Sequence, residues 1–163
     1  MPEALRIVQA TIREETAGRF VVAIELANAT DSHLHAWATP RILTYRDGTL
    51  TLRLAETEPP ENITFISAHS RVPRQIVIPA RANATLTVEV PKVLRTIEAG
   101  TPGLGNTVQE QAIDFIANLE VEIAYADTPF QPYREQDQED SYLRQLRDHG
   151  ETARATIPVT PAP

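Results

Sequence analysis

Two histidines that lie two positions apart are the residues of this chain best suited to hold a ligand. His33 and His35 would point to the same side of an extended strand, where both imidazoles could meet one ion or small molecule. A third metal ligand would have to come from Asp31, His69 or a distant carboxylate, and no spacing indicates one. We therefore predict no metal, and we take His33, His35 and Trp37 as the candidate ligand-binding residues.

The aromatic side chains leave two interpretations open. Six of them could line a sugar-binding surface by stacking: Trp37, Phe65, Tyr125, Phe130, Tyr133 and Tyr142. Trp37 is the single tryptophan, and in a β-sandwich such a residue more often packs in the core. A carbohydrate- or small-ligand-binding module, with the loops around 33–37 and 99–106 at its site, is therefore the alternative function.

The motifs that would indicate catalysis or nucleotide binding are incomplete. The acidic run Glu135–Asp140 lacks the glycine of a calcium-binding loop. The pair Gly103 and Gly105 lacks the third glycine and the βαβ context of a dinucleotide site. His69 stands between serines, but no nucleophile elbow accompanies it. The chain has no cysteine, which removes thiolate catalysis and zinc-thiolate sites. We predict that the protein is not an enzyme and uses no cofactor.

Charge and composition limit the classes of partner that the protein could bind. The 163 residues carry a net charge of −7, which argues against binding to a phosphate backbone, so we expect no nucleic acid partner. No run of 18 apolar residues and no signal peptide are visible, which predicts no direct membrane insertion and favours a cytoplasmic or virion-associated location. Arginine outnumbers lysine 14 to 1, which is typical of a GC-rich bacterial or phage genome.

The elements that would position these residues follow a period of two. In three separate segments, at 20–26, 86–90 and 119–125, every second residue is a large apolar one, so these residues share one face of an extended strand. One apolar and one polar face is typical of an antiparallel sheet with one face in water. Further short strands are expected at 4–13, 34–38, 63–67 and 75–79, separated by turn residues and prolines. The sequence therefore predicts an all-β fold.

Two turns have recognisable chemistry. Asp47 and Gly48 suit a two-residue type I′ turn, because both central residues need positive φ. That turn would place Tyr45 opposite Leu50 and Leu43 opposite Leu52. The second turn, at 28–32, begins with the glycosylation-type sequence Asn28-Ala29-Thr30, which we interpret as turn chemistry because asparagine favours turns.

Two helices are expected. Thr107 and Glu110 form a capping-box pattern, and apolar residues at helical spacing follow, so the sequence predicts a short helix near 107–117 that caps one end of the sandwich. After Phe130 the chain becomes polar, and acids followed by arginines favour a second helix around 135–146. The proline-rich end, 153–163, should form either an extended arm or a flexible tail. We divide the chain into a β-sandwich domain at 1–130 and a helical and extended C-terminal arm at 131–163.

Two stretches carry a resemblance to known β-sandwich modules. Val21–Ser32 (VVAIELANATDS) resembles the first strand and turn of immunoglobulin-like modules. Ile76–Pro91 (IVIPARANATLTVEVP) resembles a strand–turn–strand unit of bacterial immunoglobulin-like and fibronectin-type-III sandwiches. The chain is also similar to the WHy desiccation-protection fold, although the proline of that fold's Asn-Pro turn is replaced here by Ala29. The resemblance implies an antiparallel immunoglobulin-like β-sandwich that acts by adhesion, scaffolding or binding.

The function that follows is that of a non-enzymatic structural or interaction subunit in a larger bacterial or phage assembly. We expect it to dock through its C-terminal arm and its sheet edges. Its partners would be other protein subunits, either copies of itself or different chains. The predicted contact residues are the apolar side chains of the arm: Tyr142, Leu143, Leu146, Ile157 and Val159.

Overall fold

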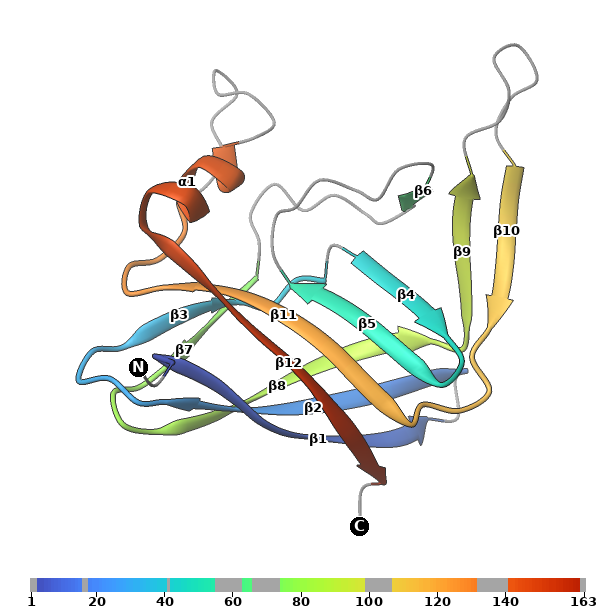
Figure 1. Cartoon of the computed structure of the whole chain (residues 1–163), viewed down its shortest axis with the longest axis horizontal. Helices are drawn as coiled ribbons and strands as arrows, with labels where there is room; N and C mark the ends of the chain where they lie inside the picture. Colours follow the sequence, from blue (N-terminus) through green and yellow to red (C-terminus); the bar gives the residue numbers. More distant parts are fainter. Residues whose placement is uncertain are drawn as a thin grey trace.

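The chain is mostly β-structure, which confirms the all-β prediction (Figure 1). The computed structural model describes residues 3–15, 18–40, 42–54, 63–65, 74–98, 107–131 and 141–161. Within these ranges there is one helix, α1 (Ser141–His149). In chain order the strands are β1 (Leu5–Glu15), β2 (Arg19–Asn28), β3 (Leu34–Trp37), β4 (Ile42–Arg46), β5 (Thr49–Leu54), β6 (Ile63–Phe65), β7 (Gln75–Ile78), β8 (Asn83–Pro91), β9 (Val93–Glu98), β10 (Thr107–Ala112), β11 (Asn118–Ala126) and β12 (Gly150–Pro161).

Nine of these strands form one curled, mixed sheet. Its strand order is β4-β5-β11-β12-β1-β2-β8, while β3 pairs with the end of β11 and β7 pairs with β3. The expectation of a purely antiparallel sheet is wrong in two places, because β5 runs parallel to β11 and β12 runs parallel to β1. Both parallel pairs join segments that are far apart in sequence, so no hairpin dictates their direction.

The core lies inside the curl and is built by the predicted alternation. Along β2, β8 and β11, every second residue is apolar and buried, as at Val22, Leu86 and Ile123. Strand β5 adds three leucines that are fully buried, at positions 50, 52 and 54. Burial of this shared apolar face is the main favourable term that holds the two sides of the curled sheet together.

The Asp47-Gly48 turn forms as predicted. Asp47 has φ 49° and Gly48 has φ 84°, which are the two positive values that a type I′ turn requires. The register of β4 and β5 then places Tyr45 opposite Leu50 and Leu43 opposite Leu52, which confirms the prediction. A side chain at position 48 would also meet the Phe115 ring, because a Cβ there would lie 2.7 Å from its Cε2 atom.

The helix expected at 107–117 is wrong. Thr107–Ala112 is strand β10, which pairs with β9 along its whole length, and β6 completes a separate three-stranded sheet. Glu110, the capping-box acid, instead lies opposite Arg95 with 3.2 Å between Oε1 and Nε. The backbone groups of 107–112 pair with those of β9, the preceding strand in the chain, instead of forming the helix that the capping pattern favours. The hairpin extends away from the curled sheet (Figure 1); the loop at 99–106 lies outside the described residues.

The C-terminal helix and extended segment are both present. Helix α1 confirms the expected helix over its second part, and the acidic run 135–140 lies outside the described residues. Gly150 allows the chain to turn at once from α1 into β12, because a Cβ there would lie 2.9 Å from the Cα of Leu146. Strand β12 lies between β11 and β1, so the extended segment is part of the sheet. Among the described residues no helix is long and apolar enough to cross a membrane.

Candidate functional site

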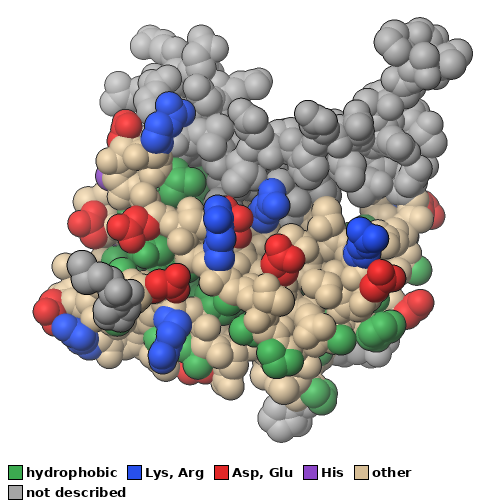
Figure 2. All heavy atoms as spheres, viewed as in Figure 1, with side chains coloured by type: hydrophobic (Ala, Val, Ile, Leu, Met, Phe, Trp, Pro, Cys, Tyr) green, Lys and Arg blue, Asp and Glu red, His purple; other side chains and the backbone are tan. Residues whose placement is uncertain are grey.

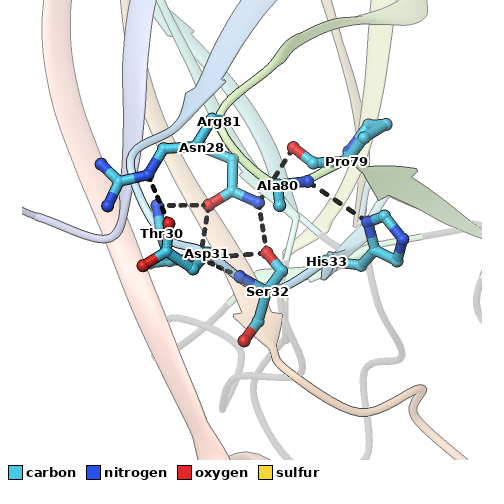
Figure 3. Close-up of polar contacts among 8 residues, drawn as sticks. All are labelled: Asn28, Thr30, Asp31, Ser32, His33, Pro79, Ala80 and Arg81. Carbon is cyan, nitrogen blue, oxygen red and sulfur yellow. Dashed lines mark hydrogen bonds and ion pairs between the residues drawn. The ribbon is translucent and has the colours of Figure 1, made fainter.

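The connection between β2 and β3 is organised by one buried side-chain amide. Asn28 is 3% exposed, and its Nδ2 donates to the carbonyls of Ser32 at 2.7 Å, Ile78 at 3.0 Å and Pro79 at 3.1 Å. Its Oδ1 accepts from the amide of Thr30 at 2.9 Å and from its hydroxyl at 2.7 Å (Figure 3). The predicted turn at 28–32 is therefore present, and Asn28 joins it to the turn between β7 and β8.

That second turn presses against the first through Arg81. Arg81 has φ 57°, which is unusual for a residue other than glycine. Its amide donates to the Thr30 carbonyl at 3.0 Å, and its Nε donates to Asp31 Oδ1 at 2.8 Å (Figure 3). The hydrogen bond and charge of Arg81 lower the pKa of the Asp31 carboxyl. These contacts hold the strained backbone of Arg81 in place.

The three predicted ligand residues do not meet at one point. His33 Nδ1 accepts a hydrogen bond from the Ala80 amide at 3.2 Å, so this imidazole joins the two turns (Figure 3). His35 is half-buried in β3, where it lies opposite Ala126. Trp37 is 2% exposed, and its ring packs edge-on against Phe130 at 5.8 Å between centroids. Trp37 thus has the core-packing role that the sequence left open.

A small pocket borders the Asn28 turn at Thr30 and Ser32. It has a volume of about 240 Å³ and is formed where the β2–β3 loop, the end of β11 and the junction of α1 with β12 come together. Its lining residues are Ala4, Thr30, Ser32, Leu34, Tyr125, Ala126, Asp127, His149 and Glu151. We call it the Tyr125 pocket.

The polar groups of the Tyr125 pocket can donate and accept hydrogen bonds. Tyr125 Oη donates to Glu151 Oε2 at 2.8 Å. Burial, followed by the hydrogen bond and charge of Glu151, raises the pKa of Tyr125 to about 12, so the phenol keeps its proton and donates a hydrogen bond. Asp127 adds a second carboxylate, and His149 lies against Phe130 with 6.2 Å between the ring centroids. No group of three metal-ligating side chains occurs in the described ranges.

Sequence reasoning named Tyr125 but missed His149 and Glu151. Glu151 lies opposite Tyr125 in the β11–β12 register, a pairing between residues 26 positions apart. A signal for it was present, because apolar Ala153, Ala155, Ile157 and Val159 alternate with polar residues or proline. The prolines at 158 and 161 concealed this alternation, since proline is disfavoured inside a sheet.

The predicted contact residues of the arm are partly used within the chain. Leu146, Ile157 and Val159 pack against the core of the same molecule, each half-buried. The side chains of Tyr142 and Leu143 lie outside the part that the structure describes. The arm from 150 to 161 is therefore held by its own body.

The outer face of β5, β11 and β12 carries charges of both signs. Glu122 lies between two arginines of the neighbouring strands, 3.8 Å from Arg53 Nε and 3.4 Å from Arg154 Nη2. They line a shallow groove. Figure 2 shows acidic and basic side chains interspersed over this side of the molecule. The two arginines and two glutamates that line the groove therefore balance each other in charge.

Strand β8 is the longest strand of the described residues that is paired on one side only. It spans nine residues and pairs with β2, and no described strand pairs with its other side. Beside that free edge lies a hollow of about 410 Å³, lined by Ala38, Thr39, Pro40, Arg74, Thr87, Val88 and Glu89. We call this the β8 edge.

No family model matches the chain, and no curated protein is significantly similar to it in sequence. We therefore base the functional assignment on the fold, the Tyr125 pocket and the β8 edge.

Proposed function

We propose that this protein is a non-enzymatic interaction subunit of a larger bacterial or phage assembly, acting as an immunoglobulin-like module. The observation that carries the proposal is the β8 edge, where nine residues present one side without a partner strand in the described chain. An edge of this kind offers a row of backbone donors and acceptors to a strand from another protein. Its partners would be other protein subunits.

In the described residues, the β8 edge lacks three of the features that normally prevent strand addition: short length, an internal proline and a bulge. Short edge strands, lysines, prolines and bulges protect most natural sheet edges. The other one-sided strands, such as β4 and β7, have five and four residues. Within β8 the only proline is the last residue, Pro91, and the pairing with β2 runs without a bulge. The geometry thus favours docking through this edge over docking through Ile157 and Val159, while Tyr142 and Leu143 remain candidate contacts on α1.

A proline at the β8 edge tests this function. Thr87→Pro would remove one backbone donor from the edge, while Thr156→Lys on the outer face of β12 serves as a control. In source cells we expect the tagged wild-type chain and Thr156→Lys to migrate in native gels above the mass of a single chain, and Thr87→Pro to migrate as a single chain. Migration of the wild-type chain as a single chain would contradict the proposal.

The Tyr125 pocket supports a second candidate function, the binding of a carbohydrate or another small polar ligand. The observation that favours it is the convergence of Tyr125, Asp127, His149 and Glu151 around one hollow. Trp37 packs on Phe130, which in turn contacts His149, so Trp37 fluorescence should report binding there.

A panel of glycans and small polyols tests the second candidate. We expect a bound compound to change Trp37 fluorescence and to raise the unfolding temperature of the wild-type chain. Glu151→Gln should raise the dissociation constant of that compound at least tenfold, because it replaces the carboxylate beside Tyr125 with an amide. No response to any compound, or an equal response in Glu151→Gln, would count against a binding role for this pocket.

A further inference from the structure

We infer that the strand that pairs with the β8 edge is β8 of a second copy of this chain, antiparallel and with Thr87 at the two-fold axis. This inference rests on the proposed function, since it names the partner of the edge described above. It follows from the direction of the backbone groups, the usable length of the edge and the side chains that would meet.

The backbone direction is set by two hydrogen bonds. Arg74 Nη2 donates to the Thr87 carbonyl at 3.2 Å, across the hollow beside the edge, so Thr87 directs its backbone groups away from β2. In a strand, the N–H and C=O of one residue point to the same side, and successive residues alternate. Thr85, Thr87 and Glu89 therefore face the open edge. The even-numbered residues face β2 instead, because the amide of Lys92 donates to the carbonyl of Gly18 just before β2.

The usable edge is centred on Thr87. At one end Pro91 has no N–H to donate. At the other end Asn83 directly follows the turn between β7 and β8, in which the Ala82 amide donates to the Pro79 carbonyl at 3.1 Å. Between these limits lie Thr85, Thr87 and Glu89. Only one antiparallel register places each of these three residues opposite one of the same three in the second copy. In that register Thr87 lies opposite the second copy's Thr87, and Thr85 lies opposite the second copy's Glu89.

The side chains in this register are compatible with a second copy. Each of the three facing pairs would exchange two backbone hydrogen bonds. Glu89 would lie opposite a threonine, and its carboxylate already has an ion pair with Arg19 at 2.7 Å. A register centred on Glu89 would instead place two carboxylates directly opposite each other, which is unfavourable. An isologous contact of this kind requires only that the strand be complementary to itself.

The edge also has room for an incoming strand. The hollow of about 410 Å³ separates Thr87 and Glu89 from Thr39 and Pro40, so among the described residues this part of the edge has no strand packed on it. Arg74 occupies one acceptor position of the Thr87 carbonyl, and this exposed side chain leaves the second lone pair for the partner's amide.

Single cysteines test the register directly, because the chain has none of its own. The three variants are made in the full chain: Thr87→Cys, Thr85→Cys and Thr156→Cys. A thermal unfolding curve first confirms that each variant folds, and folded samples are then oxidised. We expect Thr87→Cys to form a disulfide-linked dimer at least tenfold faster than Thr156→Cys, which lies on an exposed face. Thr85→Cys should be as slow as Thr156→Cys, because the two copies of Thr85 would lie four residues apart along the strands, about 13 Å, beyond disulfide reach.

The outcomes separate this inference from the proposed function. Faster cross-linking of Thr85→Cys than of Thr87→Cys would overturn the register. Cross-linking of neither above the Thr156→Cys rate would overturn self-pairing. If Thr87→Pro nevertheless releases the chain from its native complex, the edge binds a different strand, so the proposed function stands and this inference fails. If Thr87→Pro leaves that complex intact as well, both fail.

Discussion

At the scale of single residues, Asn28 is the side chain on which most local structure depends. Its amide contacts backbone atoms of both turns and is almost completely buried. A buried polar group that has all its hydrogen bonds stabilises the fold, and removal of one partner leaves several groups without theirs. The glycosylation-type sequence that begins at this residue is thus a structural element in this fold.

Substitution of Asn28 should be costly. Asn28→Ala removes the side-chain bonds to the Ile78 carbonyl and the Thr30 amide, and it leaves the Pro79 carbonyl with the Ala82 amide alone. We therefore expect a loss of about 2–4 kcal/mol in the free energy of unfolding. Asn83→Ala is the matched control, because Asn83 is exposed and makes one side-chain bond, to Glu25. Chemical denaturation measures both. A loss for Asn28→Ala no larger than for Asn83→Ala would contradict the role of Asn28.

The Tyr125–Glu151 pair predicts a pH dependence. The pKa of Tyr125 rises from 10.0 to about 12 in the fold, so the folded state favours the neutral phenol. Its stabilising contribution is complete below pH 10 and is lost as the pH rises through about 12. We expect the unfolding temperature to fall more steeply over this interval in the wild-type chain than in Tyr125→Phe. Equal slopes would show that Tyr125 is not the group that titrates.

At the scale of elements, β8 has two sides with different roles. Even-numbered residues such as Val88 direct their amides toward β2, and odd-numbered ones such as Thr87 direct theirs toward the open edge. The sequence reflects this division at Pro91, where a missing N–H at the open side removes no bond to β2.

Proline substitutions at neighbouring positions should therefore have different effects. Val88→Pro removes a ladder bond to β2, and we expect a loss of about 3 kcal/mol or more in the free energy of unfolding. Thr87→Pro removes only an amide at the open edge, so it should lose less than half as much. Denaturation curves of the two variants measure this difference. A similar loss for both would show that Thr87 does not face the edge.

At the scale of the whole molecule, the C-terminal strand completes the sheet. Strand β12 pairs with β11 over residues 150–158 and with β1 over residues 159–161, so it connects the two sides of the curled sheet. Ala153 is buried, and Ile157 and Val159 pack against the core. The same strand supplies Glu151 to the Tyr125 pocket.

Deletion of this strand tests whether residues 1–130 are a domain of their own. We expect a chain that ends at residue 149 to lose cooperative unfolding, because β11 and β1 would each lose a neighbour and the core would be exposed. A synthetic peptide of residues 150–161 should restore a thermal transition by strand addition. A truncated chain that unfolds cooperatively without the peptide would show that the sheet is complete without β12.

The sequence by itself determined the features that are local. The alternation along β2, β8 and β11 and the positive φ values of Asp47 and Gly48 depend on neighbouring residues, so strands and hairpin register were predictable. The tertiary structure decided which distant segments pair. It made 107–112 a strand beside β9, inserted β12 between β11 and β1, and brought Glu151 to Tyr125. Those outcomes depend on which arrangement buries the shared apolar face, and that is a property of the whole chain rather than of any segment.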